Sequence, residues 1–188
     1  MQIPYRVTKH GTHSIAAVTL AIVLAGRATA AVFTDDFSGG LNQSYWLVES
    51  SQLGYTVSTT EGGMTFARPE TDSGQGFQYA KLTSKLVASG AFDVQVDFTN
   101  AELTLADGGS ANQVELVCYM GGRIFYTIRS DESGWGQSAH AWIYNAGPQA
   151  GTFGWQGWEG TSGTLRITHG RTGRMSFWVG KGSNLDGA

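Results

Sequence analysis

Carboxylates at alternate positions are the first residues in this sequence that could do chemistry. Asp93 and Asp97 share one side of the apolar–polar alternation at 92–98, with Gln95 between them. Two carboxylates hydrolyse a glycosidic bond when they stand about 5–5.5 Å or 6.5–9.5 Å apart. At about 3.3 Å per residue, the Cα atoms of this pair would be about 13 Å apart in a strand. The spacing favours a solvated acidic face over a catalytic pair, and Glu115 is isolated among apolar neighbours.

The most suggestive set of residues is aromatic. Four of the six tryptophans fall within 134–160, interleaved with amide side chains. Sugar rings can stack their C–H faces on aromatic rings while nearby polar groups bind the hydroxyls. Packing in a core is the alternative interpretation, because tryptophan is usually mostly buried. The predicted ligand-binding residues are Asp93, Gln95, Asp97, Trp142 and Tyr144.

Metal binding has one candidate place. Asp35 and Asp36 are adjacent and could offer calcium the hard oxygen ligands that it prefers, although turn formation is the alternative role. His140 and His169 have no neighbour at zinc-ligand spacing, so we expect structural or surface roles for them. No cofactor is predicted apart from this calcium hypothesis, and the absence of a nucleophile motif makes an enzyme the less favoured interpretation.

The elements that must position these residues are strands. Runs with a period of two recur every 8–12 residues between Gly, Ser, Asn and Asp, and no convincing amphipathic helix follows residue 31. This pattern predicts an all-β antiparallel fold with about a dozen strands in one domain. The predicted elements are a strand at 92–98, hairpins around 61–63, 121–122 and 171–173, and exposed loops at 70–76 and 104–112.

The first 30 residues have the composition of a secretory signal peptide. Arg6 and Lys9 precede a 12-residue apolar run at 15–26, which is too short to span a bilayer, and the small residues at 28–30 predict cleavage before Ala31. An uncleaved anchor or a buried helix is the alternative. The sequence therefore predicts a secreted or cell-surface protein that no membrane segment holds after cleavage.

Charge and cysteine content narrow the function classes. Residues 31–188 carry nine basic and 15 acidic side chains, a formal charge of −6, which argues against a nucleic-acid partner. Cys118 is the single cysteine, so an intramolecular disulfide is excluded. It alternates in phase with Val114 and Leu116, which predicts a position in the core. The basic residues near the end, such as Arg166 and Arg171, are expected on the solvent side.

Several stretches together resemble the concanavalin A-like lectin/glucanase superfamily, and more closely the exported bacterial domains with a DDFSGG-type opening. The stretches that carry the resemblance are 35–40 (DDFSGG), 81–84 (KLTS), 90–98 (GAFDVQVDF) and 163–168 (GTLRIT). The resemblance implies a two-sheet antiparallel jelly-roll sandwich whose concave sheet often binds carbohydrate. It also implies that further strands follow the 163–180 hairpin, so a jelly-roll domain at 31–188 would be incomplete at its C-terminus.

The resemblance does not by itself choose an activity, because this fold carries lectins, glycosidases and spacers. The Glu-x-Asp-x-x-Glu pattern of the superfamily's glucanases is absent from this sequence. We therefore expect an exported, non-catalytic, lectin-like carbohydrate-binding or attachment module with a glycan or polysaccharide as partner. A glycoside hydrolase or polysaccharide lyase with a divergent site is the alternative, and a structural spacer of a larger surface protein is the third hypothesis. The oligomeric state is left open.

Overall fold

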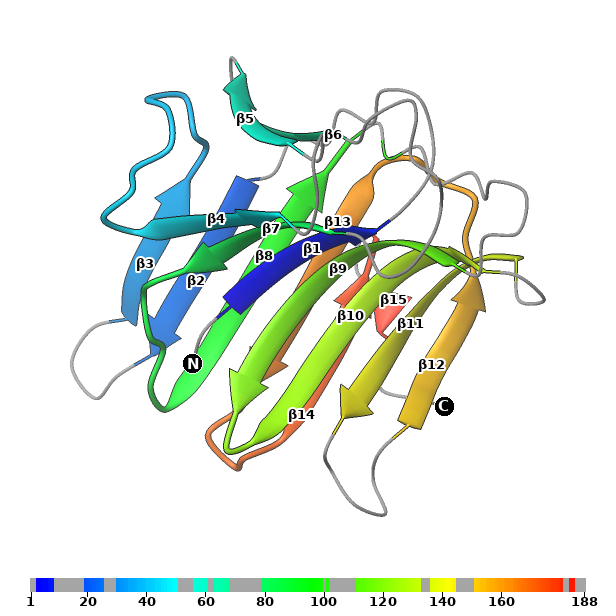
Figure 1. Ribbon diagram of the computed structural model, residues 1–188. Coiled ribbons are helices and arrows are strands. Elements are labelled where there is room, and N and C mark those ends of the chain that lie inside the picture. The colour runs from blue at the N-terminus through cyan, green and yellow to red at the C-terminus, as the bar shows by residue number, and fades with distance from the viewer. Residues whose placement is uncertain are drawn as a thin grey trace.

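Two antiparallel β-sheets lie face to face in the protein (Figure 1). The structure is a computed structural model, and it describes residues 3–8, 19–25, 30–50, 56–60, 63–67, 79–99, 101, 111–132, 136–144, 151–180 and 183–184. These residues contain strands and turns and no helix. The predicted all-β antiparallel architecture is confirmed.

One sheet has seven strands in the order β12-β11-β10-β9-β1-β7-β4. Their bounds are Gly151–Gly157 (β12), Gly136–Tyr144 (β11), Arg123–Glu132 (β10), Ala111–Met120 (β9), Ile3–Thr8 (β1), Ala80–Ser84 (β7) and Trp46–Ser50 (β4). In Figure 1 the strand direction turns across this sheet, so that β4 and β7 run at a large angle to β11 and β12. Such a turn is the accumulated right-handed twist of the strands.

The other sheet has six strands in the order β15-β14-β13-β8-β2-β3. Their bounds are Ser183–Asn184 (β15), Met175–Val179 (β14), Gly163–His169 (β13), Ala91–Phe98 (β8), Thr19–Ala25 (β2) and Ala30–Asp35 (β3). A separate hairpin pairs β5 (Thr56–Thr60) with β6 (Gly63–Ala67). All the pairs in both sheets are antiparallel, as short connections and alternating sequences favour.

Alternation along the strands makes the core between the sheets. In β8 the apolar residues Phe92, Val94, Val96 and Phe98 are buried, and the polar residues between them are half-buried on the other face. In β9, Cys118 is buried in the core as predicted. Burial raises the pKa of the Cys118 thiol, because a thiolate would lose its solvation there.

The predicted hairpins are confirmed by the pairing of β5 with β6, of β9 with β10 and of β13 with β14. Gly121 and Gly122 take φ values of 59° and 77°, which a two-residue turn of type I′ requires. The loop predicted at 104–112 ends earlier than expected, because β9 already begins at Ala111. The rest of that loop, and the loop predicted at 70–76, lie outside the described residues.

Part of the predicted signal peptide forms two strands in the structure. Residues 3–8 are β1, between β9 and β7, and residues 19–25 are β2, between β8 and β3. The signal peptide and the cleavage before Ala31 stay predictions, and membership in the folded domain is a second interpretation of the same residues. No helix among the described residues is long and apolar enough to cross a membrane.

Candidate functional site

The outer face of the seven-stranded sheet is built by residues that alternate with core residues. In β9, Val114, Leu116 and Cys118 belong to the core, so the residues between them lie on the opposite face. The cross-strand pairs continue both faces into β10 and β11, because directly paired residues share a face. This outer face therefore collects side chains from strands that are far apart in the sequence.

Aromatic rings gather at one end of this face. Tyr119 is 40% exposed, Trp142 is 41% exposed and Tyr144 is 51% exposed. Tyr126 pairs with Trp142 in the register, and the centroids of their rings are 6.3 Å apart. We call these four residues the aromatic strip. Its rings come from three neighbouring strands, β9, β10 and β11, which fixes their spacing to that of a sheet.

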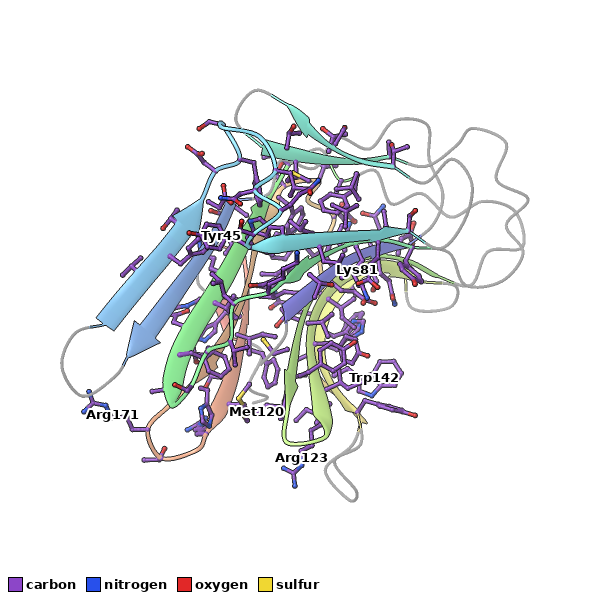
Figure 2. The ribbon with its side chains drawn as sticks, turned by 60° about the vertical axis from the view of Figure 1, so that its left-hand side comes forward. Tyr45, Lys81, Met120, Arg123, Trp142 and Arg171 are labelled. Carbon is purple, nitrogen blue, oxygen red and sulfur yellow. The ribbon has the colours of Figure 1, made fainter. Side chains whose placement is uncertain are left out.

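A row of mostly charged residues crosses the same face beside the aromatic strip. The register pairs each residue with the next across six strands, and these pairings define what we call the charged row: Glu49, Lys81, Arg6, Glu115, Ile128 and His140. Opposite charges at directly paired positions stabilise a sheet. Figure 2 shows Lys81 and Trp142 on the same side of the molecule, with Arg171 on the side of the six-stranded sheet.

One end of the charged row is held by a hydrogen-bonded ion pair. The Nζ of Lys81 lies 2.7 Å from Oε2 of Glu49, and the hydroxyl of Thr83 donates to the same oxygen at 3.1 Å. These interactions hold the pKa of the Glu49 carboxyl below its usual value, chiefly because the hydrogen bond from Lys81 favours the charged form. The pair is partly exposed, so it orders this part of the face without adding much stability.

The other end of the charged row is almost fully buried, although it lies on the outer face. Glu115, Ile128 and His140 are 2–3% exposed. Beside them, the hydroxyls of Ser130 and Ser138 are 3.2 Å apart and also buried. His140 is two residues from Trp142 on the same face of β11, and Glu115 is two strands away from His140. Because these polar groups are buried, a ligand on this face would meet the exposed rings beside them.

The acidic residues predicted for the ligand surface lie elsewhere, on the outer face of the six-stranded sheet. Asp93 forms an ion pair with the guanidinium of Arg166, and the Arg166 guanidinium lies 5.6 Å from the Trp178 ring centroid. The hydrogen bond to Asp93 raises the pKa of Arg166. Asp97 accepts hydrogen bonds from Thr164 at 2.6 Å and from Gln95 at 3.0 Å.

The structure therefore divides the five predicted ligand-binding residues between two faces. Trp142 and Tyr144 share the outer face of the seven-stranded sheet, whereas Asp93, Gln95 and Asp97 lie across the core on the six-stranded sheet. The structure does not bring these two groups together in one site. Arg166 lies on the side away from the core, as expected, but it is engaged by Asp93 rather than freely solvated.

The predicted calcium residues form turns in the structure. The two carboxylate oxygens of Asp35 accept hydrogen bonds from the backbone N–H of Phe37 at 2.8 Å and from the indole N–H of Trp46 at 2.7 Å. Asp36 accepts one from the backbone N–H of Ser38, which lowers its pKa. Among the described residues, no group of three or more His, Cys, Asp or Glu side chains could hold a metal. Calcium at these two residues stays a prediction.

Other aromatic residues of the 134–160 stretch have different positions. Trp158 packs against the core, and Gly160, Gly163 and Gly180 lie directly against its ring. Trp155 is 50% exposed at the point where the pairing of β11 with β12 shifts its register. Part of the stretch is therefore exposed and part is packed against the core, and stacking of a sugar on it stays a prediction.

Sequence reasoning missed the polar half of this face. Glu115 has apolar neighbours in the sequence, and His140 was expected to be structural, so neither was proposed for a site. Their neighbours in the charged row come from β1, β7 and β10, which only the strand order reveals. The signal available in the sequence was a charged residue inside an apolar strand, because an unpaired buried charge is strongly unfavourable.

Comparison with known protein families places the chain in one of them. The family described as "Protein of unknown function (DUF1583) C domain" matches residues 16–178, which is most of the chain, so the chain belongs to this family. No curated protein and no solved structure matches it.

Proposed function

We propose that this member of a protein family of unknown function is a carbohydrate-binding module whose ligand lies on the aromatic strip. The observation that carries the proposal is the exposure of Trp142 and Tyr144 at alternate positions of β11, with Tyr119 exposed two strands away. Large exposed rings that share one sheet face need a reason, because such rings are otherwise buried. Flat sugar rings are ligands that such a face suits.

The charged row lies beside the aromatic strip on the same outer face. Glu115 and His140 flank Ile128 in the charged row, and the row runs beside the rings of Tyr126 and Trp142. Glu115 and His140 are 2–3% exposed, so a ligand on the strip would contact the exposed rings rather than these two groups. A glycan or polysaccharide is therefore the proposed partner, and the binding site is a surface of the sheet.

The finer fold assignment is part of this proposal. Two antiparallel sheets in which strands distant in the sequence are neighbours, such as β9 beside β1 and β13 beside β8, support the concanavalin A-like jelly roll that the DDFSGG-type opening suggests. A jelly-roll fold supports carbohydrate binding by analogy alone, so the aromatic strip is the main support for the proposed function.

Binding is favoured over hydrolysis by the positions of the acids. In the charged row, Glu49 and Glu115 are separated by three strand spacings, or about 14 Å at about 4.8 Å each. Glycosidases place their carboxyl groups no more than about 9.5 Å apart. On the six-stranded sheet, Asp93 and Asp97 are each engaged by neighbouring side chains. The described residues therefore favour a non-catalytic module, and export stays a prediction based on residues 1–30.

The test is binding of the full chain to a panel of insoluble and soluble polysaccharides, followed by calorimetry with oligosaccharides of the best one. Replacing a central interface ring with alanine commonly weakens binding by 2 kcal/mol or more. We therefore expect Trp142→Ala to weaken binding about 30-fold or more, and Tyr144→Ala to weaken it less, because Tyr144 is the more exposed ring.

Tyr45→Ala is the matched control. Tyr45 is 38% exposed, similar to Trp142, but its ring packs edge-on against Phe33 and lies away from the aromatic strip in Figure 2. We expect this variant to bind normally. Equal binding by Trp142→Ala and the unmodified chain would refute the proposed face, and release of reducing sugars from the polysaccharide would support the hydrolase instead.

A further inference from the structure

Residues 19–25 occupy an inner position of the six-stranded sheet that no other described segment could fill. β2 pairs with β8 from Thr19↔Asp97 to Ala25↔Ala91, and with β3 from Leu20↔Asp35 to Ala25↔Ala30. Among the described strands, β3 has no sheet neighbour except β2. Without β2, β3 would lose its pairing, and β8 would present a long open edge of unpaired backbone groups.

The register of β2 matches the two faces of β8. Leu20, Ile22 and Leu24 stand opposite Val96, Val94 and Phe92, which are 0–4% exposed and belong to the core. The residues between them, such as Ala21 and Val23, stand opposite Gln95 and Asp93 on the outer face. A slip of one residue would place Ala21 and Val23, instead of Leu20, Ile22 and Leu24, in line with the core residues of β8. The apolar run of a leader peptide has no such requirement for alternate positions.

The other N-terminal strand, β1, fits its sheet in the same way. Tyr5 stands between Leu82 and Leu116, and both of these residues are buried in the core. Arg6 stands between Lys81 and Glu115 in the charged row, so the register sets its position opposite a carboxylate that is 2% exposed. The pairing with Glu115 favours this register, whereas the like charge of Lys81, which Glu49 partly balances, opposes it. The family match also extends across β2, since it begins at residue 16.

From these pairings we infer that β1 and β2 are permanent strands of the folded domain, and that residues 19–25 fill the position between β8 and β3 in the protein as it functions. The cut before Ala31 that the N-terminal composition predicts would remove one inner strand from each sheet. A domain that begins at Ala31 could not form the sheets described here. The segment with the composition of a leader therefore has a structural role.

The direct test is the N-terminus of the purified full-length gene product, carrying a C-terminal tag and isolated in folded form. Intact mass and N-terminal sequencing should show that β1 and β2 are present. Hydrogen exchange of the same sample should protect the backbone amides of residues 20–24 as strongly as those of β8, because an inner strand opens only with its neighbours. A folded protein that starts at Ala31, or exchange of 20–24 within seconds, would overturn the inference.

A pair of neighbouring substitutions separates the strand from a leader. Ile22→Lys places a charge opposite Val94 on the core face, whereas Ala21→Lys places the same charge opposite Gln95, between Asp93 and Asp97. We expect Ile22→Lys to lose its cooperative thermal transition or to lower the midpoint by roughly 10 °C or more, and Ala21→Lys to keep the midpoint within a few degrees.

A leader would respond alike to these two variants, because either lysine interrupts the same apolar run. Equal effects of the two substitutions on yield and thermal midpoint would therefore contradict the strand assignment. If Ile22→Lys gives no soluble protein, the exchange of residues 20–24 in the unmodified chain and in Ala21→Lys still decides the question.

Discussion

The packing of Trp158 makes a quantitative prediction about its glycine neighbours. A Cβ atom added at Gly163 would lie 2.8 Å from Cζ2 and 3.0 Å from Cη2 of Trp158, and 3.3 Å from Cζ of Phe98. At Gly180 it would lie 2.5 Å from Cη2 of the same ring, and at Gly160 2.2 Å from its Nε1. Carbon atoms pack best at about 3.5–4.0 Å. Because glycines surround the indole on several sides, the ring cannot move away from one of them without approaching another.

The expected energies follow from overpacking and its relief. Gly163→Ala should destabilise the protein by about 1–3 kcal/mol through overpacking, reduced by about 0.4–1 kcal/mol because alanine lowers the entropy of the unfolded chain. Trp158→Ala alone should destabilise by about 3 kcal/mol, the lower end for a tryptophan since this ring is only partly buried. In the Trp158→Ala background only the 3.3 Å contact with Phe98 remains, so Gly163→Ala should become close to neutral. The two substitutions should therefore be coupled by about 2 kcal/mol.

The assay is urea denaturation of the four proteins of this cycle, followed by far-UV circular dichroism, since the removal of a tryptophan alters fluorescence. Gly39→Ala is the control, because a Cβ at Gly39 meets no atom within 4 Å. A Gly163→Ala variant as stable as Gly39→Ala would refute the packing argument. An unchanged effect of Gly163→Ala in the Trp158→Ala background would refute it as well.

Four further outcomes follow from other contacts. The pKa of Glu49 in the folded protein is lowered from 4.5, so its pair with Lys81 stabilises the protein above about pH 5, and this stabilisation is lost as the pH falls. Urea denaturation between pH 3 and pH 7 measures how far the free energy of unfolding decreases on acidification. In Lys81→Met this decrease should be smaller by less than about 1 kcal/mol. Cys118 should resist alkylation at pH 8 in the native protein and react on unfolding, as mass spectrometry would show. Arg129→Met should destabilise by about 1–3 kcal/mol in thermal unfolding, because it removes the buried guanidinium that donates to Gly160, Ser130 and Gln137 and leaves these acceptors unsatisfied. Asp35→Ala should destabilise by about 1–3 kcal/mol through its lost hydrogen bonds, and a calcium-dependent rise of the melting temperature in the unmodified chain alone would support a metal there.

The strands of the fold were predictable because each carries its own period of two. The alternation at 92–98 and the glycines at 121–122 are local signals, and both are found in the structure as expected. The predicted end of the 104–112 loop was wrong because Ala111 and Asn112 have no strong local preference for a strand. Their place in β9 comes from pairing with Glu132 and Asp131 of β10. Pairing with a distant strand is information that a local pattern does not contain.

The candidate site was harder to predict than the strands, because a surface depends on which strands are neighbours. The exposure of Trp142 and Tyr144 agrees with the alternation of β11, whose Ala139 and Ala141 face the core. The sheet that holds Asp93 is set by its pairing with β2 and β13, and no periodicity specifies that choice. The sequence therefore predicted one ligand surface for two sets of residues that lie on different sheets. These are Asp93, Gln95 and Asp97 on the one hand, and Trp142 and Tyr144 on the other.

The two outer faces of the sandwich differ in what a ligand would displace, and this difference favours the proposed ligand face. On the six-stranded sheet, Asp93 and Asp97 are already engaged by Arg166 and Thr164. A ligand there would have to replace interactions that the sheet makes for itself, which gains little. On the seven-stranded sheet, the exposed ring of Trp142 would lose only water, and the burial of apolar ring surface is favourable.

The proposed ligand face and the N-terminal strands are linked through Arg6. β1 lies between β9 and β7, so Arg6 is the residue of the charged row that joins Lys81 to Glu115. A chain that begins at residue 31 lacks β1, so the aromatic strip and the Glu49–Lys81 ion pair would no longer be joined by this strand, whatever the ligand is. Loss of glycan binding by such a fragment would therefore not count against the proposed ligand face. Binding by the fragment with full affinity would show that the ligand needs neither β1 nor the part of the charged row beyond it. The carbohydrate assay thus has to be made on the full chain, with Trp142→Ala, rather than truncation, as the decisive change.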